Sequence, residues 1–299
     1  MVKEHFCDLH THSTFSDGTD TPTELIKKAE QAGLAAIALT DHNSISGLTE
    51  FLTAAKESSV IAVPGTEFST EYNGKELHIV GLFIKEEHFQ NVNDFCENVR
   101  KSKENSNQIL IDNLIRAGYA VKYEELLDYA QSDNINRAVI AGYLIEKGIV
   151  KDRKEAFTTL LAKDGGFYVP AKKPSTFDTI QFIKSIGAVA VLAHPFLDLS
   201  YEEVQTFLPE AKKYGLDAIE TDYSTYDGYM TKCAKMLALK DDLLFSGGSD
   251  YHGKAKTLIR LGVGKGNLNI PLEYYKELAK CASIPMAVTA CADSIGIMP

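Results

Sequence analysis

The chain has 299 residues, of which 44% are hydrophobic and 24% charged, and its formal net charge is −10. This length can bury the core of one large α/β domain, or of one domain with an insertion, and the composition is ordinary for a globular protein. The acidic balance argues against a general nucleic-acid or anionic-membrane surface, but not against a small anionic substrate in a local basic pocket. The chain shows no apolar run of transmembrane length, no signal-peptide core and no CxxC spacing among its five cysteines, so we expect a cytoplasmic protein with reduced thiols.

Strands and helices are expected to alternate through the first ninety residues. Strands are predicted at 2–9, 34–40, 60–64 and 76–84, and helices at 22–33 and 46–58. The same alternation returns near the C-terminus, with strands at 188–193, 217–220 and 243–246 and a helix at 201–214. This βα rhythm predicts a parallel sheet, and seven strands favour a closed barrel slightly over an open sheet.

The middle of the chain has a different character. Apolar residues recur at helical spacing, and helices are predicted at 123–130, 137–147 and 153–162, without an intervening strand. We therefore expect residues 92–171 to form an all-helical insertion in a barrel domain built from residues 1–91 and 172–299.

The first strand leads into Asp8, His10 and His12. Alternate side chains of a strand share a face, so these three point the same way, and Cys7 points into the core on the other face. Two imidazoles at this spacing can hold one cation, with Asp8 orienting one of them. Taken alone, the pair could equally be two polar surface histidines.

Further candidate metal ligands follow the predicted strands. The set comprises His10, His12, Asp17, Asp41, His42, Glu67, His78, His194, Asp250 and His252. Active sites of α/β folds form at the carboxyl ends of strands, which favours one shared centre. Each residue also has a structural alternative: Asp17 could belong to a turn, His78 could be a core histidine, and for Asp41 we favour a helix cap.

Together these residues predict a metal cluster. Imidazoles and carboxylates without thiolates suit Zn, Mn or Fe better than Ca. The number of ligands exceeds one tetrahedral site, so we expect two or three divalent ions, with a carboxylate such as Glu67 bridging two of them.

The motifs that carry these residues resemble those of the PHP (polymerase and histidinol phosphatase) superfamily of metal-dependent phosphoesterases. They are DLHTHSTFSDG at 8–18, LTDHNSISG at 39–47, PGTEFS at 64–69, LHIVGLF at 77–83, VLAHPF at 191–196 and GGSDYHG at 247–253. The resemblance implies an α/β fold, a distorted seven-stranded (β/α) barrel with a trinuclear metal site. One metal would be held by His10, His12, Glu67 and Asp250, a second by Glu67, His78 and His194, and a third by Asp17, His42 and His252. A metal-bound hydroxide held by Glu67, Asp250 and His194 would then attack phosphorus.

The insertion resembles the subgroup that acts on nucleoside 3′,5′-bisphosphates and on the 5′ ends of short RNAs. The resemblance implies that Arg137 and one of Lys172 and Lys173 hold a substrate phosphate, Arg as a bidentate fork and Lys as a point charge. The sequence departs from that subgroup after Arg137, where Ala138-Val139 replaces the usual Pro-His. Arg137 and the two lysines could also be solvated surface charges.

These observations predict a cytoplasmic metal-dependent phosphatase that acts on a small nucleotide bisphosphate. The alternatives are a histidinol phosphatase, a 5′-3′ exonuclease on short RNA, and a non-catalytic metal-binding PHP module. The complete ligand set argues against the module, and the basic residues of the insertion argue against a cationic substrate. Hydrolysis of a C–N bond is disfavoured because no lysine is placed at a strand end to bridge metals.

Overall fold

The computed structural model describes residues 6–130, 135, 137–163 and 165–282. The chain divides into two compact units, residues 1–93 with 174–299 (the barrel unit) and residues 94–173 (the inserted unit). The start of the strand predicted at 2–9 and the C-terminal part of the predicted barrel, 283–299, lie outside the described residues. Among the helices that are described, none has both the length and the apolar character needed to cross a membrane.

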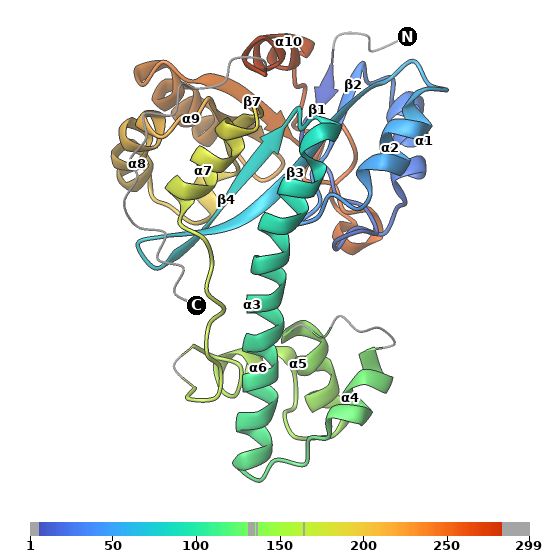
Figure 1. Cartoon of the computed structure of the whole chain (residues 1–299), viewed down its shortest axis with the longest axis vertical. Coiled ribbons are helices and arrows are strands. Elements are labelled where there is room, and N and C mark those ends of the chain that lie inside the picture. The colour runs from blue at the N-terminus through green and yellow to red at the C-terminus, as the bar shows by residue number, and fades with distance from the viewer. Residues whose placement is uncertain (1–5, 131–134, 136, 164, 283–299) are drawn as a thin grey trace. The chain divides into compact units, whose positions relative to one another are not determined.

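The barrel unit is built on a seven-stranded sheet in which each strand pairs with the next along the chain (Figure 1). The strands are β1 (Cys7–Asp8), β2 (Ala36–Leu39), β3 (Ile61–Tyr72), β4 (Lys75–Leu82), β5 (Val189–Leu192), β6 (Ala218–Tyr223) and β7 (Leu244–Gly248). After β1, the Leu9 amide donates to the Gly247 carbonyl at 3.1 Å, and Thr11 forms a bridge with Tyr251. The first and last strands therefore meet, and the predicted α/β barrel is confirmed as a nearly closed one.

The expectation of an all-parallel sheet is wrong at β4. This strand runs antiparallel to both β3 and β5. The chain reverses between β3 and β4 through a two-residue turn at Asn73-Gly74. The φ angles of these two residues, 50° and 76°, are those of tight hairpin turns whose twist matches that of the strands. Because of this hairpin, β3 continues to Tyr72 and does not end near residue 64, so Glu67 lies within a strand.

Helices surround the sheet of the barrel unit (Figure 1). They are α1 (Pro22–Ala32), α2 (Leu48–Ala55), η1 (Glu86–His88), α7 (Thr176–Ser185), η2 (Pro195–Leu197), α8 (Tyr201–Lys213), α9 (Gly228–Lys240), η3 (Gly253–Lys256) and α10 (Leu272–Cys281). The start of α1 shows why they form: Thr21 and Glu24 make a reciprocal capping box, and Pro22 occupies the first turn, where no amide donor is lost.

Small and branched side chains fill the interior of the barrel. Alternate residues of the strands, such as Ala36 and Ala38 or Val189 and Val191, belong to one buried cluster. The same cluster includes Cys7, which is fully buried as predicted, and Leu278 of α10. Helix α10 contacts β1, β5 and β7. Apolar packing therefore closes one end of the barrel, and the polar cluster described below lies at the other.

The inserted unit is all-helical in its described residues. It contains most of α3 (Phe89–Arg116) together with α4 (Tyr123–Ala130), α5 (Arg137–Glu146) and α6 (Arg153–Thr158). The helices predicted at 123–130 and 137–147 are confirmed, whereas the one predicted at 153–162 ends at Thr158. Buried leucines and isoleucines from these helices, with the fully buried Tyr143, form a core of their own.

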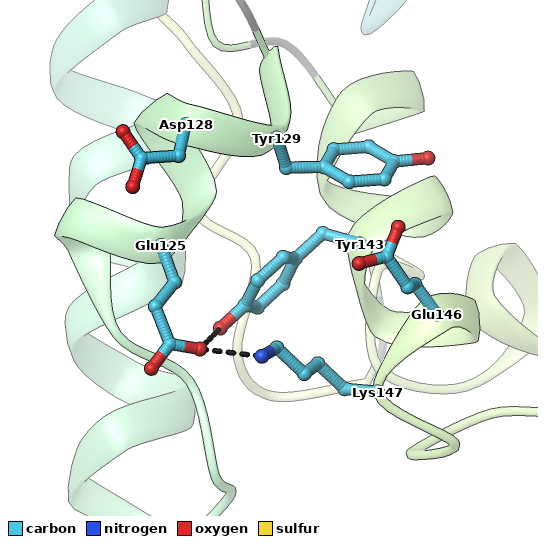
Figure 2. A pocket seen from close by; sticks show the side chains of 6 residues that line it. All are labelled: Glu125, Asp128, Tyr129, Tyr143, Glu146 and Lys147. Atoms are coloured by element: carbon cyan, nitrogen blue, oxygen red, sulfur yellow. Dashed lines mark hydrogen bonds and ion pairs between the residues drawn. The ribbon is translucent and has the colours of Figure 1, made fainter.

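A pocket in the inserted unit carries mainly acidic groups. Figure 2 shows its six lining residues, Glu125, Asp128, Tyr129, Tyr143, Glu146 and Lys147. Glu125 accepts a hydrogen bond from the Tyr143 hydroxyl at 3.4 Å and pairs with Lys147 at 2.5 Å. Three carboxylates against one ammonium repel a phosphate ester, so this pocket is no candidate for binding one.

Candidate metal centre

The first two candidate ligands follow β1 directly. The chain stays extended to His12, whose amide donates to the Tyr251 carbonyl at 2.9 Å, so this segment is fixed against the end of β7. His10 and His12 are both buried, and their ring centroids lie 5.1 Å apart. The alternation predicted from the sequence therefore does bring both imidazoles to one place.

Glu67 lies at the centre of the cluster and is completely buried. Its Oε2 atom lies within 3.4 Å of a ring nitrogen of three histidines, His10, His12 and His42. Its Oε1 atom lies within 2.9 Å of a ring nitrogen of two others, His78 and His194. One carboxylate thus contacts five imidazoles.

The β3–β4 hairpin explains how Glu67 reaches His78. In this register Glu67 pairs with Val80 and Ser69 pairs with His78, so Glu67 and His78 are diagonal neighbours on one face. Their side chains meet at 2.8 Å, between Glu67 Oε1 and His78 Nδ1. The antiparallel strand that the βα rhythm did not predict is what brings these two residues together.

Asp17 and His42 form the more exposed side of the cluster, and the buried His252 lies beside Asp17. Asp17 Oδ1 lies 3.2 Å from His252 Nε2, and Asp17 Oδ2 lies 3.9 Å from His42 Nε2. The Asp17 side chain is 56% exposed, in contrast to the buried Glu67. The cluster is therefore open to solvent on this side, where a ligand can enter.

Asp250 and His194 hold strained backbone conformations. Asp250 has φ of 54° and His194 has φ of 26°, in the left-handed region that non-glycine residues rarely adopt. Asp250 Oδ1 lies 3.2 Å from His12 Nε2 and 3.8 Å from His10 Nε2. Strain of this kind tends to persist at functional sites, where the surrounding structure enforces it.

The residues fit a group of bound metal ions. Four overlapping sets of three or four side chains place their ligand atoms within 4.8 Å of one another, and together these sets contain every candidate ligand except Asp41. Buried ring nitrogens of His10, His12, His42 and His194 have no hydrogen-bond partner among the described residues. The same is true of Glu67 Oε2. Buried polar atoms that point at one another without hydrogen bonds are costly unless a cation satisfies them.

The charges within the cluster are strongly coupled. Burial alone would raise the pKa of Glu67, but His42 and His78, followed by His10, hold it well below its usual range. Burial and the neighbouring His42 lower the pKa of His12 to about 3, so His12 is neutral at pH 7, as a metal ligand must be. Burial disfavours charge on His78 as well, but Glu67 raises its pKa to about 10.

Asp41 does not join the cluster. Its carboxylate accepts hydrogen bonds from the Ser13 amide at 2.7 Å, the Ser13 hydroxyl at 2.6 Å and the Ser16 hydroxyl at 2.5 Å. It therefore fixes the loop that follows His12. The favoured prediction of a helix cap is wrong, because α2 begins at Leu48 and has no side-chain cap.

Glu220 is a buried residue of the site that sequence reasoning missed. It lies in β6, is 2% exposed, and its Oε1 atom lies 3.3 Å from His10 Nδ1. Its Oε2 atom accepts a hydrogen bond from the His194 amide at 2.8 Å. The available signal was a carboxylate inside a short apolar strand, a position that normally excludes charge.

The residues predicted to hold a substrate phosphate lie in the inserted unit. Arg137 begins α5, and its guanidinium lies 4.3 Å from the centre of the Tyr168 ring and 5.8 Å from that of Phe157. It is half-buried by this stacking. Lys172 is exposed and Lys173 is half-buried. These contacts orient Arg137 more tightly than a freely solvated side chain would be.

The fold and the cluster together define the class of a metal-dependent phosphoesterase. The model of the PHP domain matches residues 8–165. The chain belongs to the PHP domain family, and the resemblance seen in the sequence is confirmed.

Three relatives share most of their length with this chain. A 5′-3′ exoribonuclease of Haemophilus influenzae is 31% identical, over 84% of this chain and 91% of its own. A phosphoribosyl 1,2-cyclic phosphate 1,2-diphosphodiesterase of Eggerthella lenta is 31% identical, over 83% of this chain and 94% of its own. A 3′,5′-nucleoside bisphosphate phosphatase of Chromobacterium violaceum is 30% identical, over 82% and 86%. All three names describe cleavage of a phosphate ester.

Solved structures share the fold. A protein of Bifidobacterium adolescentis assigned as a metal-dependent phosphoesterase superposes with a TM-score of 0.73 at 27% identity, covering 94% of this chain and 97% of its own. A Chromobacterium violaceum protein described as an amidohydrolase, solved with sulfate and without metal, gives a TM-score of 0.75 at 27% identity, over 92% and 96%.

Proposed function

We propose that this enzyme removes a phosphate from a nucleoside 3′,5′-bisphosphate with the help of two or three divalent metal ions. The observation that carries the proposal is the convergence of five histidines on the buried carboxylate of Glu67. Such a set of imidazoles and carboxylates suits Mn, Zn or Fe. When bound, these ions lower the pKa of water and neutralise charge on a phosphoryl group.

Three groups of side chains would hold the ions. They are His10, His12, Glu67 and Asp250; Glu67, His78 and His194; and Asp17, His42 and His252. Glu67 can belong to two of these groups because its two oxygens face different histidines. Glu67, Asp250 and His194 surround the position where we place the reaction. Their burial strengthens each electrostatic contact with a substrate.

The substrate is proposed from the inserted unit and from one relative. A nucleoside bisphosphate phosphatase is 30% identical to this chain. Arg137 is held against the Tyr168 ring, which leaves the edge of its guanidinium suited to a phosphate. We propose that Arg137, with Lys172 or Lys173, binds the second phosphate of the bisphosphate. That contact distinguishes the bisphosphate from a simple monoester.

A second candidate is a 5′-3′ exoribonuclease acting on short RNA. A protein with that name is 31% identical over 84% of this chain. The bisphosphate phosphatase has a similar identity, 30%, over 82% of this chain. Both reactions require an anionic nucleotide at the cluster, so the residues of the barrel unit serve either one. The length of nucleic acid that is accepted separates the two.

The test is phosphate release by Mn-loaded protein with and without chelator. The substrates are adenosine 3′,5′-bisphosphate, histidinol phosphate and a short 5′-phosphorylated RNA. Chelator-sensitive release from the bisphosphate supports the proposal. Release of nucleotides from the RNA, without turnover of the bisphosphate, would replace it with the exoribonuclease. Turnover of histidinol phosphate alone would overturn the assignment of Arg137 and the lysines.

A further inference from the structure

An ammonium group lies at the rim of the cluster, and none of the roles above uses it. Lys256 ends η3, the short helix that follows His252, and its Nζ atom lies 2.6 Å from Asp250 Oδ2. The Tyr223 hydroxyl donates to the same oxygen at 2.7 Å. The other oxygen of Asp250, Oδ1, faces His12. Asp250 therefore contacts a histidine of the cluster through one oxygen, and Lys256 and Tyr223 through the other.

The two members of this ion pair differ in exposure. The Asp250 side chain is 8% exposed and that of Lys256 is 42% exposed. The ammonium of Lys256 thus contacts the buried carboxylate, while much of the lysine side chain stays exposed to solvent. An ammonium group has three donors, and Asp250 Oδ2 takes one of them. A ligand that approaches the cluster from solvent can accept the others.

The charge of the cluster indicates which ligand that would be. With the proposed ions bound, their positive charge would offset the carboxylates of Asp17, Glu67 and Asp250, so the cluster would attract a phosphate ester. A further positive charge on a flexible stem beside Asp250 can follow the phosphate to its bound position. Lys256 also belongs to the barrel unit, like the proposed metal ligands, so its contact with the reacting phosphate needs nothing from the inserted unit.

We infer that Lys256 binds a non-bridging oxygen of the phosphoryl group that is hydrolysed. This inference rests on the proposed phosphatase function. It assigns Lys256 to the reacting phosphate and leaves Arg137 to the second one. Loss of Lys256 therefore weakens the binding of every phosphate monoester alike, whereas loss of Arg137 weakens the binding of the bisphosphate in particular.

The test compares Lys256→Met with Lys254→Met in the full-length, Mn-loaded chain. Lys254 is an exposed lysine on the same short helix, so the two variants lose the same charge. Metal content is measured first, by mass spectrometry of the ions. Binding of inorganic phosphate is then measured by calorimetry and by inhibition of p-nitrophenyl phosphate hydrolysis.

We expect Lys256→Met to bind phosphate about 10- to 100-fold more weakly with unchanged metal content, because a charge-assisted hydrogen bond is lost. Lys254→Met should change binding by less than about twofold, as is usual for exposed charges. Lys256→Arg, which keeps the charge, should recover most of the binding and also serves if Lys256→Met folds poorly.

Two results would overturn the inference. One is unchanged phosphate binding in Lys256→Met. The other is weaker binding that appears only together with lost metal or a lower melting temperature, in which case Lys256 serves as a counter-ion of Asp250. Failure of the proposed function looks different, because the wild-type enzyme would then bind phosphate through Lys256 and yet hydrolyse no nucleotide.

Discussion

Glu220 Oε1 lies 3.3 Å from Nδ1 of His10, deep inside the barrel unit. This contact fixes the imidazole so that its other nitrogen, Nε2, faces Glu67 Oε2 at 3.3 Å. Burial opposes protonation of His10, but Glu67 and Glu220 together hold its pKa well above its ordinary value. Glu220 is therefore a positioning residue: it orients a candidate metal ligand without reaching the metal position itself.

Replacing Glu220 tests this role. In Glu220→Gln the amide keeps an acceptor but loses the charge that orients His10, and we expect affinity for Mn to fall about 10- to 100-fold. Competition with an indicator chelator measures this directly. Glu210→Gln, an exposed glutamate on α8, is the matched control. Equal Mn affinity in Glu220→Gln and wild type would show that the contact is structurally incidental.

Gly248 packs directly against His10 at the end of β7. A Cβ atom at this position would lie 2.2 Å from His10 Cβ and 2.7 Å from its backbone nitrogen. Gly248→Ala must therefore push the His10 segment away, at a cost of about 1–3 kcal/mol in the free energy of unfolding. We expect lower metal content as well as a lower melting temperature. Gly228→Ala is the control, since a Cβ there meets nothing within 4 Å. If both variants retain full metal content, the close approach does not position His10.

Arg137 should affect one class of substrate more than another. We expect Arg137→Ala to raise the KM for adenosine 3′,5′-bisphosphate about tenfold or more, because it removes a charge-assisted contact to the second phosphate. The KM for p-nitrophenyl phosphate, which has no second phosphate, should stay nearly constant. Arg153→Ala, an exposed arginine at the start of α6, is the control. Equal changes for both substrates would contradict the assignment.

A buried ion pair away from the cluster should make stability depend on pH. Lys184 Nζ lies 2.8 Å from Asp217 Oδ2, and the side chains are 6% and 16% exposed. Burial raises the pKa of Asp217, while Lys184 and the Ala190 amide oppose that rise. Lys184→Met leaves the carboxylate without its counter-ion, which should cost about 3–5 kcal/mol of the free energy of unfolding at neutral pH.

The sign of the pH effect follows from the direction of this shift. A carboxyl group whose pKa is higher in the folded state favours folding when protonated, and that contribution is lost as the pH rises through the folded pKa. Lys184→Met raises the pKa of Asp217 in the folded state further. The loss in the free energy of unfolding, measured with urea, should therefore be larger at pH 8 than at pH 5. The double variant Lys184→Met with Asp217→Asn should recover stability and lose the pH dependence. A deficit that is the same at both pH values would contradict this account.

Local patterns in the sequence were sufficient for much of the fold. The helix at 22–33 was predicted from Pro22 and Gly33, and the structure ends α1 at Ala32 with Gly33 at φ of 70°. The pattern failed at β4, although the Asn73-Gly74 pair is a strong hairpin signal. The βα rhythm suggested parallel strands throughout, and the predicted end of a strand near residue 64 concealed the longer hairpin.

The sequence by itself determined which side chains could ligate metal, because His10-x-His12 and Asp250-x-His252 are local spacings that can be read along the chain. It could not determine that Glu67 would stand between five imidazoles, since that depends on the β3–β4 register and on the meeting of β1 with β7. Nor could it show that Glu220 supports His10 or that Lys256 reaches Asp250. The first contact joins segments far apart in the chain, and only the closure of the barrel brings them within hydrogen-bonding distance. The second spans six residues and depends on how the chain turns between Asp250 and η3.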